Sequence, residues 1–262
     1  MALVRCEFFS DVLGLNLTMT VIMPQATSAK IGISGRARDT EHPTLYLLHG
    51  LSDDDTIWTR LTSIERYVEP LGLAVVMPQV HRSFYADEVH GHRYWTFLTE
   101  ELPATVGSFF RLSSRRADTY VAGLSMGGYG AFKWALRHPD RFAAAASLSG
   151  ALDMANRRRA GVAEGPDPHL FDRVFGDDPV VGTDNDLLWL LDRADPASLP
   201  SLYLSCGTED FLYGESVTFS EACARRGVPL TVDFGPGDHD WGYWDTKIRD
   251  VLAWLPLTAP DE

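Results

Sequence analysis

The stretch TYVAGLSMG, residues 119–127, decides the fold, because a run of strand-forming residues leads directly into a Gly-x-Ser-x-Gly motif. Helical character follows at residues 131–136, AFKWAL. In a nucleophile elbow, glycines allow a tight turn between strand and helix, and the strained turn lifts the serine hydroxyl clear of the sheet. The helix amino terminus also favours negative charge nearby. The setting predicts that Ser125 is a nucleophile, which the motif by itself would indicate only weakly.

Further strands are predicted on both sides of this stretch, from apolar and β-branched runs that alternate with longer helical patterns. This alternation is typical of an α/β fold, with a mostly parallel central sheet and helices on both faces. Residues 15–23 differ, because apolar residues occupy every second position, and they predict an antiparallel strand pair at the sheet edge. The other predicted strands are 44–48, 73–77, 119–122, 143–148, 201–205 and 230–234.

The chain of 262 residues is long enough for one large domain, and we expect residues 1–262 to form it. Its 45% hydrophobic and 23% charged residues indicate a globular protein with a sizeable core. Between residues 151 and 200 the pattern loosens into a sequence rich in Asp, Pro, Gly and Arg. A cap-like insertion there would lie over the carboxyl edge of the sheet, where open α/β sheets bind ligands.

The formal net charge of −13 at pH 7 disfavours nucleic acid and anionic membrane surfaces as principal partners. The triple arginine at residues 157–159 is interpreted as a solvated face. No signal peptide or bilayer-spanning run is recognisable, and the scattered Cys6, Cys206 and Cys223 lack metal-ligand spacing. We therefore expect reduced thiols and a cytoplasmic location.

A serine hydroxyl needs a base to take its proton, and the base needs an acid that orients it. After a nucleophile elbow, the chain order is serine, acid, histidine, which restricts the base to the histidines after Ser125. His138 lies at a helix end and His169 lies in the irregular insertion. His239 follows the last predicted strand in a loop, and we expect it to be the base.

Two acids are candidates for orienting this base. Glu209 and Asp210 both follow the strand at residues 201–205, from which a carboxylate can reach a histidine in the neighbouring loop. Either could instead cap the helical pattern that starts near Tyr213. Spacing along the chain does not choose between them.

The tetrahedral intermediate of acyl transfer requires two preorganised hydrogen-bond donors. One is the backbone N–H after the nucleophile, which is that of Met126. The other is expected in the loop after an earlier strand, where His49-Gly50 lets the backbone approach closely and makes Leu51 the candidate. The alternative interpretation of His49-Gly50 is a plain strand-ending turn.

No metal and no cofactor are predicted. His90 and His92 lack companion ligands at zinc-like spacing, and a dinucleotide-binding Gly-x-Gly-x-x-Gly motif is absent. Several aromatic residues fall on loops beside the expected catalytic groups, where they could line an acyl or aromatic pocket, with ordinary core packing as the alternative. These candidate substrate-binding residues are Trp58, Tyr85, Trp95, Trp241 and Trp244.

Three motifs together carry a resemblance to a known family: LLHGLS at 47–52, GLSMGGYGA at 123–131 and HDW at 239–241. The chain resembles the esterase D-related putative esterase family over nearly its whole length. Within that family it is most similar to the tributyrin-type, short-chain esterases. The segments that carry this closer likeness are RSFY at 82–85, YW at 94–95, EELP at 100–103, GTED at 207–210 and WGYW at 241–244.

The resemblance implies the α/β-hydrolase fold, with Asp210 as the triad acid and with Leu51 and Met126 as oxyanion donors. Two features depart from the family pattern. Asp238 stands where a glycine commonly precedes the catalytic histidine, and residues 52–55, SDDD, form an unusually acidic loop. Either could alter the base or disfavour anionic substrates, but neither removes a catalytic group.

These observations predict a serine carboxylesterase that hydrolyses short-chain acyl esters, acetyl or aryl esters included, through an acyl-enzyme on Ser125. Its partner would be a small-molecule ester. The alternatives are an acyltransferase of the mycolyltransferase type, a thioesterase resembling S-formylglutathione hydrolases, and a non-catalytic binding module that retains the fold. The sequence leaves open the natural ester, its acyl length and whether the chain forms a homo-oligomer.

Overall fold

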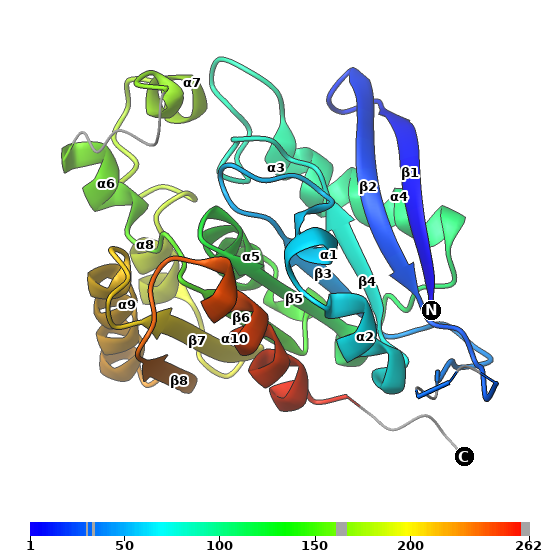
Figure 1. Ribbon diagram of the computed structural model, residues 1–262. Helices are drawn as coiled ribbons and strands as arrows, with labels where there is room; N and C mark the ends of the chain where they lie inside the picture. Colours follow the sequence, from blue (N-terminus) through cyan, green and yellow to red (C-terminus); the bar gives the residue numbers. More distant parts are fainter. Residues whose placement is uncertain (30, 33–34, 161–166, 258–262) are drawn as a thin grey trace.

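The computed structural model describes residues 1–29, 31–32, 35–160 and 167–257, which contain one sheet of eight strands (Figure 1). The strand order is β1-β2-β4-β3-β5-β6-β7-β8. The central strands are buried along their whole length because both faces of the sheet are covered. The strands are β1 (Ala2–Ser10), β2 (Leu15–Met23), β3 (Thr44–Leu48), β4 (Ala74–Pro78), β5 (Thr119–Leu124), β6 (Ala144–Leu148), β7 (Ser201–Gly207) and β8 (Leu230–Gly235).

The N-terminal strands join this sheet as an antiparallel pair, which confirms the prediction from residues 15–23. β1 pairs with β2 along the whole length of both strands, and β2 in turn pairs antiparallel with β4. The pairs that follow, from β4 through β3 and β5 to β8, are all parallel. The carboxyl ends of β3, β5, β7 and β8 therefore meet at one edge of the sheet, where α/β proteins place their ligands.

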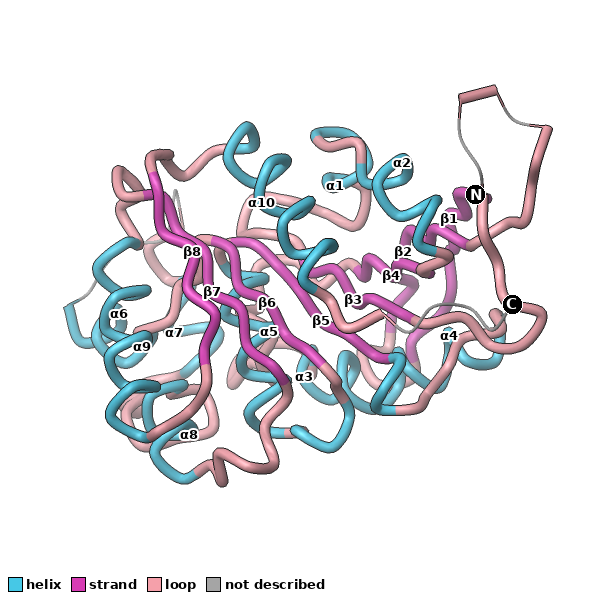
Figure 2. The backbone as a smooth tube through the Cα atoms, turned by 90° about the horizontal axis from the view of Figure 1, so that it is seen from below, coloured by secondary structure: helices cyan, strands magenta, loops and turns pink. Residues whose placement is uncertain are grey.

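Helices cover both faces of the sheet (Figure 2). The helices are α1 (Ile57–Leu61), α2 (Ile64–Val68), α3 (Tyr94–Thr96), α4 (Leu102–Phe109), α5 (Met126–Arg137), α6 (Met154–Ala160), α7 (Leu170–Phe175), α8 (Leu187–Arg193), α9 (Tyr213–Arg226) and α10 (Trp241–Trp254). One face carries α1, α2 and α10, and the other carries α3, α4, α5, α8 and α9. Successive residues of β3 divide accordingly: Leu45 and Leu47 belong to the apolar cluster on the face of α1, α2 and α10, whereas Tyr46 and Leu48 belong to the cluster on the face of α5.

The predicted fold class is confirmed, and the predicted strands differ from the observed ones only at their ends. β5 continues to Leu124 and β7 continues to Gly207. β4 and β6 each begin one residue later than predicted, at Ala74 and Ala144. These differences arise because the periodic pattern marks the buried middle of a strand, whereas hydrogen bonding to neighbours sets its ends.

The expected cap-like insertion at residues 151–200 divides into two parts. Residues 161–166 of this range lie outside the described residues. α6 and α7 stand at the carboxyl end of the sheet (Figure 1), where α7 packs Phe171 and Phe175 against Phe84. α8 instead packs against α5 and α9 in the helical layer. A cap role for α6 and α7, and a single domain over residues 1–262, stay predictions.

The arginine run at residues 157–159 is not a uniformly solvated face, so the interpretation from the sequence is wrong for Arg157. Arg157 is buried, and its Nη1 lies 2.8 Å from Oε1 of Glu215 in α9. Arg158 pairs with Asp172 of α7 at 2.8 Å. A short charge run looks solvated in sequence, but here its members bind α6 to two other helices.

The cysteines of the described ranges form no disulfide bond. Cys6, Cys206 and Cys223 are free. Burial raises the pKa of Cys206 and of Cys223 to about 12, so both thiols stay protonated and pack as small apolar groups. Separately, none of the helices in the described ranges is long and apolar enough to cross a bilayer.

Candidate active site

Ser125 stands on a strained turn between β5 and α5. Its φ of 53° and ψ of −118° are rare for a residue with a side chain. The turn is tight because a Cβ on Gly123 would lie 2.4 Å from the Gly127 backbone. A Cβ on Gly127 would lie 2.4 Å from the carbonyl oxygen of Leu48 in β3. The Ser125 N–H donates to the Leu148 carbonyl at 2.9 Å, which holds the elbow against β6.

His239 connects Ser125 to a buried carboxylate. It lies in the loop between β8 and α10, with Nε2 3.1 Å from Ser125 Oγ and Nδ1 2.9 Å from Asp210 Oδ2. Two rings hold the imidazole, that of Phe211 with its centroid at 4.6 Å and that of Trp244 at 4.8 Å. The structure thus brings the predicted nucleophile, base and acid into one hydrogen-bonded chain, which is the arrangement that activates a serine hydroxyl.

The environment of Asp210 keeps its carboxyl ionised. The residue is buried in the turn after β7, with 4% of its surface exposed. Burial raises the pKa of the carboxyl, but hydrogen bonds from His239, from the Leu212 N–H at 2.8 Å and from the Ser149 hydroxyl outweigh burial, and the pKa lies below its ordinary value. A carboxylate at Nδ1 keeps the hydrogen on Nδ1 and leaves Nε2 able to accept the serine proton.

Glu209, the other candidate acid, holds the backbone of the histidine loop instead. Its Oε2 accepts the Gly237 N–H at 2.6 Å, and its Oε1 accepts the Thr208 hydroxyl at 2.8 Å. The Gly237 carbonyl in return accepts the Glu209 N–H at 3.1 Å. The direction of the turn after β7 therefore separates two neighbouring carboxylates, a distinction that spacing along the chain could not make.

The two acidic residues that flank His239 also hold backbone. Asp238, the departure noted in the sequence, accepts the His239 N–H through Oδ1 at 2.7 Å. Asp240 caps α10 by accepting the Tyr243 N–H at 2.9 Å. Both carboxylates therefore fix the path of the loop on either side of the imidazole.

The two candidate oxyanion donors lie beside Ser125. Across the described part of the chain, neither the Leu51 N–H nor the Met126 N–H donates a hydrogen bond to a protein atom. A Cβ on Gly50 would lie 3.7 Å from Ser125 Cβ, which places the loop after β3 against the nucleophile. Met126 is the first residue of α5, so its amide carries the positive end of that helix. Both amides therefore lie near Ser125, and their role as oxyanion donors stays a prediction.

A pocket of about 420 Å³ opens over these groups. One wall is the loop after β3, and the other wall is formed by the turn after β7 and the start of α10. The pocket lies toward the small end of the range for ligand sites in proteins. Its lining residues are Gly50, Leu51, Ser52, Asp53, Leu124, Ser125, Phe211, His239, Asp240, Trp241 and Trp244.

Of the aromatic residues predicted to bind substrate, Trp241 and Trp244 line this pocket. Trp58, Tyr85 and Trp95 do not, and the prediction is wrong for these three. Trp58 and Tyr85 are buried behind the loop after β3, with 1% and 0% of their surface exposed. Trp95 packs into the core of the α5 face. Trp58 lies in α1 and Trp95 in α3, and their large rings are directed into the core, where burial is more favourable.

Sequence reasoning missed Phe211. Its ring packs on His239 and lines the pocket although 69% of the residue is exposed. A large apolar side chain directly after the candidate acids in GTEDF was the available signal.

The charged groups of the pocket are acidic. Among its described lining residues, Asp53 and Asp240 carry carboxylates, and none is Lys or Arg. Burial raises the pKa of Asp53, although a hydrogen bond from the Gly50 backbone and the charge of His239 act in the opposite direction. An anionic group entering the pocket would therefore meet Asp53 without a compensating cation.

The remaining histidines named in the sequence lie outside this constellation. His138 caps the carboxyl end of α5, and His169 precedes α7. His92 Nδ1 contacts the Leu13 carbonyl at 3.2 Å. Within the described ranges, no group of three or more His, Cys, Asp or Glu side chains could hold a metal ion.

Comparisons with known proteins agree with this geometry. The family model described as "Putative esterase" matches residues 27–255. An acetyl esterase of Caldicellulosiruptor saccharolyticus is 29% identical over 97% of this chain and 98% of that protein.

Two solved structures are similar over the whole fold. The fluorophosphonate-binding serine hydrolase F of Staphylococcus aureus, substrate bound, is 37% identical with a TM-score of 0.87, and the match covers 97% of this chain and 98% of that one. The S-formylglutathione hydrolase of Staphylococcus aureus, as the apoenzyme, is also 37% identical, with a TM-score of 0.84 and the same coverage of 97% and 98%.

Proposed function

The chain belongs to the putative esterase family, and we propose that it hydrolyses short-chain acyl esters through an acyl-enzyme formed on Ser125. It is a serine esterase with the α/β-hydrolase fold. The observation that carries the proposal is the hydrogen-bonded chain from Ser125 Oγ through both ring nitrogens of His239 to Asp210.

In the proposed reaction, Ser125 Oγ attacks the ester carbonyl carbon while His239 Nε2 takes the hydroxyl proton. The carbonyl oxygen gains negative charge and accepts hydrogen bonds from the Leu51 and Met126 amides. The bond to the alcohol oxygen then breaks, and His239 gives its proton to that oxygen. Water repeats the sequence on the acyl-enzyme, which releases the carboxylic acid and restores the serine. Asp210 stabilises the imidazolium that forms in both halves.

The size and lining of the pocket support a small substrate. A volume of about 420 Å³ must hold both the acyl and the alcohol side of the ester. Leu124, Phe211, Trp241 and Trp244 supply the apolar surface against which a short acyl chain can pack. The name of the similar protein from Caldicellulosiruptor saccharolyticus, acetyl esterase, agrees with this size.

The charge of the pocket favours uncharged oxygen esters over anionic thioesters. One similar structure is an S-formylglutathione hydrolase, whose substrate carries the carboxylates of glutathione. Here Asp53 faces the incoming group, and no lysine or arginine is among the described lining residues. We therefore expect a neutral short-chain ester to be turned over faster than a glutathione thioester with the same acyl group.

The free, scattered cysteines support a reducing compartment, and a cytoplasmic location is part of this proposal. Fractionation of the source cells with detection of the chain tests that part. Recovery outside the cell would contradict it.

The proposed nucleophile is tested by Ser125→Ala. We expect kcat on 4-nitrophenyl acetate to fall about 10⁴-fold or more, because the acyl-enzyme cannot form. A fluorophosphonate probe should label the wild type and not the variant. The matched control is Ser108→Ala, the same change at an exposed serine of α4, which should leave both readouts unchanged. Near-normal turnover by S125A would refute the assignment.

A series of 4-nitrophenyl esters from acetyl to decanoyl tests the substrate class. We expect kcat/KM to be highest for the shortest chains and to fall as the acyl group outgrows the pocket. Added alcohols separate hydrolysis from transfer, because an acyltransferase would make the new ester faster than the free acid. Preference for long chains, or transfer that outruns hydrolysis, would contradict the proposal.

A further inference from the structure

Three consecutive carbonyl groups in the segment Leu48-His49-Gly50 each accept a hydrogen bond from a buried side chain. The Leu48 carbonyl accepts from Trp58 Nε1 at 3.1 Å. The His49 carbonyl accepts from the Tyr85 hydroxyl at 2.9 Å, and the Gly50 carbonyl contacts His49 Nδ1 at 2.7 Å. This segment leads directly to Leu51, whose amide is a candidate oxyanion donor. We call the three donors, Trp58, Tyr85 and His49, the carbonyl clamp.

The contacts of His49 fix which ring nitrogen carries its hydrogen. The Val80 N–H donates to Nε2 at 3.1 Å, so Nε2 must be an acceptor. The hydrogen therefore lies on Nδ1, which donates it to the Gly50 carbonyl. Burial lowers the pKa of His49 to about 4, and the ring is neutral at physiological pH. This is the tautomer that holding the Gly50 carbonyl requires.

Holding the Gly50 carbonyl also aims the Leu51 amide. The carbonyl of Gly50 and the N–H of Leu51 belong to one planar trans peptide unit, in which they point in opposite directions. A donor that fixes the direction of the carbonyl therefore fixes the direction of the N–H. His49 thus sets the orientation of the Leu51 amide without touching a bound ester.

The carbonyl clamp is itself anchored to the helix that carries the other oxyanion donor. The Tyr85 carbonyl accepts from Lys133 Nζ of α5 at 2.8 Å. A Cβ on Gly130 of α5 would lie 2.5 Å from the Tyr85 ring, so this ring rests directly on the helix backbone. Because Met126 begins the same helix, Tyr85 ties the Leu51 loop to the Met126 amide in one rigid unit.

We propose that His49, Tyr85 and Trp58 are positioning residues that keep the Leu51 amide aimed at the developing oxyanion. The proposal rests on the proposed function, in which Leu51 is an oxyanion donor. It assigns a role to two aromatic residues, Trp58 and Tyr85, that lie outside the substrate pocket. Their hydrogen bonds contribute in the transition state, where charge develops, rather than to binding of the ester.

Tyr85→Phe is the decisive variant, because it removes one hydroxyl and retains the buried ring. We expect kcat to fall about tenfold, since small misplacement of a catalytic donor is costly, while KM stays within about twofold. Affinity for a trifluoromethyl ketone, which mimics the tetrahedral intermediate, should fall by the same factor as kcat/KM. Rates are to be expressed per active site, counted with a fluorophosphonate.

Tyr120→Phe is the matched control. Tyr120 is also fully buried, and its hydroxyl donates to the Ala117 carbonyl at 3.0 Å, at the opposite end of β5. It should lose comparable stability to thermal unfolding but keep kcat per active site. Trp58→Phe gives a second test of the carbonyl clamp, with the same kinetic pattern as Y85F expected.

Two results would overturn the proposal. One is a Y85F protein whose kcat per active site and ketone affinity equal those of Y120F, which would make the hydroxyl merely structural. The other is a rise in KM that accounts for the whole loss. The rate of reaction with the fluorophosphonate, whose phosphoryl oxygen also needs the oxyanion donors, tests the carbonyl clamp even if no carboxylic ester is turned over. Failure of the proposed function and failure of the clamp are therefore distinguishable.

Discussion

Two buried aspartates stand at opposite ends of the parallel strands, and they differ in what they contact. Asp210 follows β7 at the carboxyl edge, whereas Asp118 precedes β5 at the amino edge. Both are nearly excluded from solvent, with 4% and 2% of their surface exposed. For both, burial raises the pKa but hydrogen bonds outweigh it, so each pKa lies below the ordinary value.

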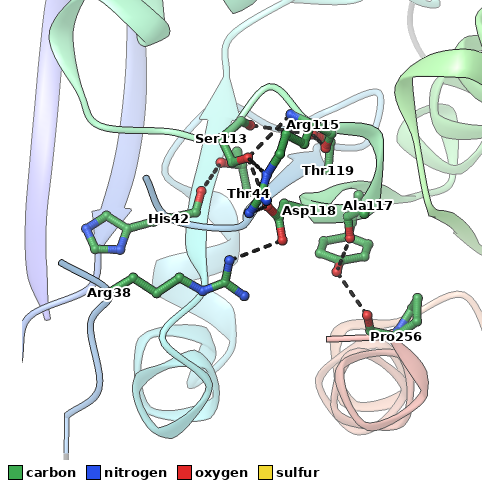
Figure 3. A network of polar contacts seen from close by, with 10 residues as sticks. Arg38, His42, Thr44, Ser113, Arg115, Ala117, Asp118, Thr119 and Pro256 are labelled. Carbon is green, nitrogen blue, oxygen red and sulfur yellow. Dashed lines mark hydrogen bonds and ion pairs between the residues drawn. The ribbon is translucent and has the colours of Figure 1, made fainter. Parts of the chain in front are cut away.

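The partners of Asp118 are permanently charged or neutral. Figure 3 shows Arg38, Arg115 and Ser113 arranged around its carboxyl group. The Arg38 Nη1 lies 3.2 Å from Oδ1, and Oδ2 contacts Arg115 Nη2 at 2.5 Å and the Ser113 hydroxyl at 2.9 Å. A guanidinium does not give up its proton at any physiological pH. Among the described contacts of Asp118, no side chain changes its charge near neutral pH, so the network joins segments of the fold without a base that could take up a proton.

Asp210 contacts an imidazole instead, and that single difference changes what the carboxylate can do. An imidazole, unlike a guanidinium, can take up a proton at one nitrogen while the other donates a hydrogen bond, and the second nitrogen of His239 reaches Ser125. Burial and a lowered pKa therefore do not by themselves identify a catalytic carboxylate, because Asp118 and Asp210 share both. The two residues differ in whether the partner of the carboxylate can take up a proton.

Replacing Asp210 by Asn should have the largest effect on activity. The amide can present an N–H to Nδ1 of His239, which would move the imidazole hydrogen to Nε2 and block proton transfer from Ser125. We expect kcat for a 4-nitrophenyl ester to fall about 10⁴-fold. Steady-state kinetics measures kcat, and thermal unfolding shows whether the variant is folded. A kcat above about a tenth of the wild-type value would contradict the assigned role.

Asp118→Asn should lower the stability of the fold and leave the activity nearly unchanged. Removing one member of a buried ion-pair network should lower the free energy of unfolding by about 3 kcal/mol, while kcat stays within about twofold. Urea titration measures the first quantity and ester hydrolysis the second. A large loss of kcat per active site in D118N would show that the amino-edge network acts on the catalytic site after all.

The pH dependence of the D118N effect has a definite sign. A carboxyl whose pKa is lowered by folding contributes stability above its unfolded pKa and loses it as pH falls through its folded pKa. The stability difference between wild type and D118N should therefore be largest near neutral pH and should shrink below about pH 4. A difference that stays constant on acidification would mean that the charge of Asp118 is not what stabilises the network.

The smallest effect is expected for Asp53→Asn, which removes a charge from the pocket wall. We expect the preference for a cationic over an anionic ester of the same acyl group, measured as kcat/KM, to fall about fivefold. Raising the salt concentration should weaken the same preference in the wild type. Because the pKa of Asp53 is raised, acidification should weaken the preference for a cationic ester at a higher pH than it would with an ordinary aspartate. An unchanged preference in D53N would exclude Asp53 as its source.

Local patterns in the sequence were sufficient for the strands and for the elbow. Strand alternation, continuous apolar runs and the strand-to-helix change at Ser125 are each set by neighbouring residues, because burial repeats with the period of the element. The chain order of serine, acid and histidine likewise follows from the order of parallel strands. That is why the sequence alone indicates the loop carrying His239 and the pair Glu209 and Asp210.

Only the tertiary structure decided which side chains meet. Glu209 and Asp210 are neighbours in sequence, but the turn after β7 directs one to the Gly237 amide and the other to His239. Trp58 and Tyr85 were expected in the pocket, and they instead donate to the backbone behind it. Sequence indicates which apolar runs are buried, because hydrophobicity is a property of each side chain, but the buried Arg157 and the exposed Phe211 depart from that rule. Which donor reaches which acceptor depends on directions and distances of a few ångströms, and these exist only once the strands are packed.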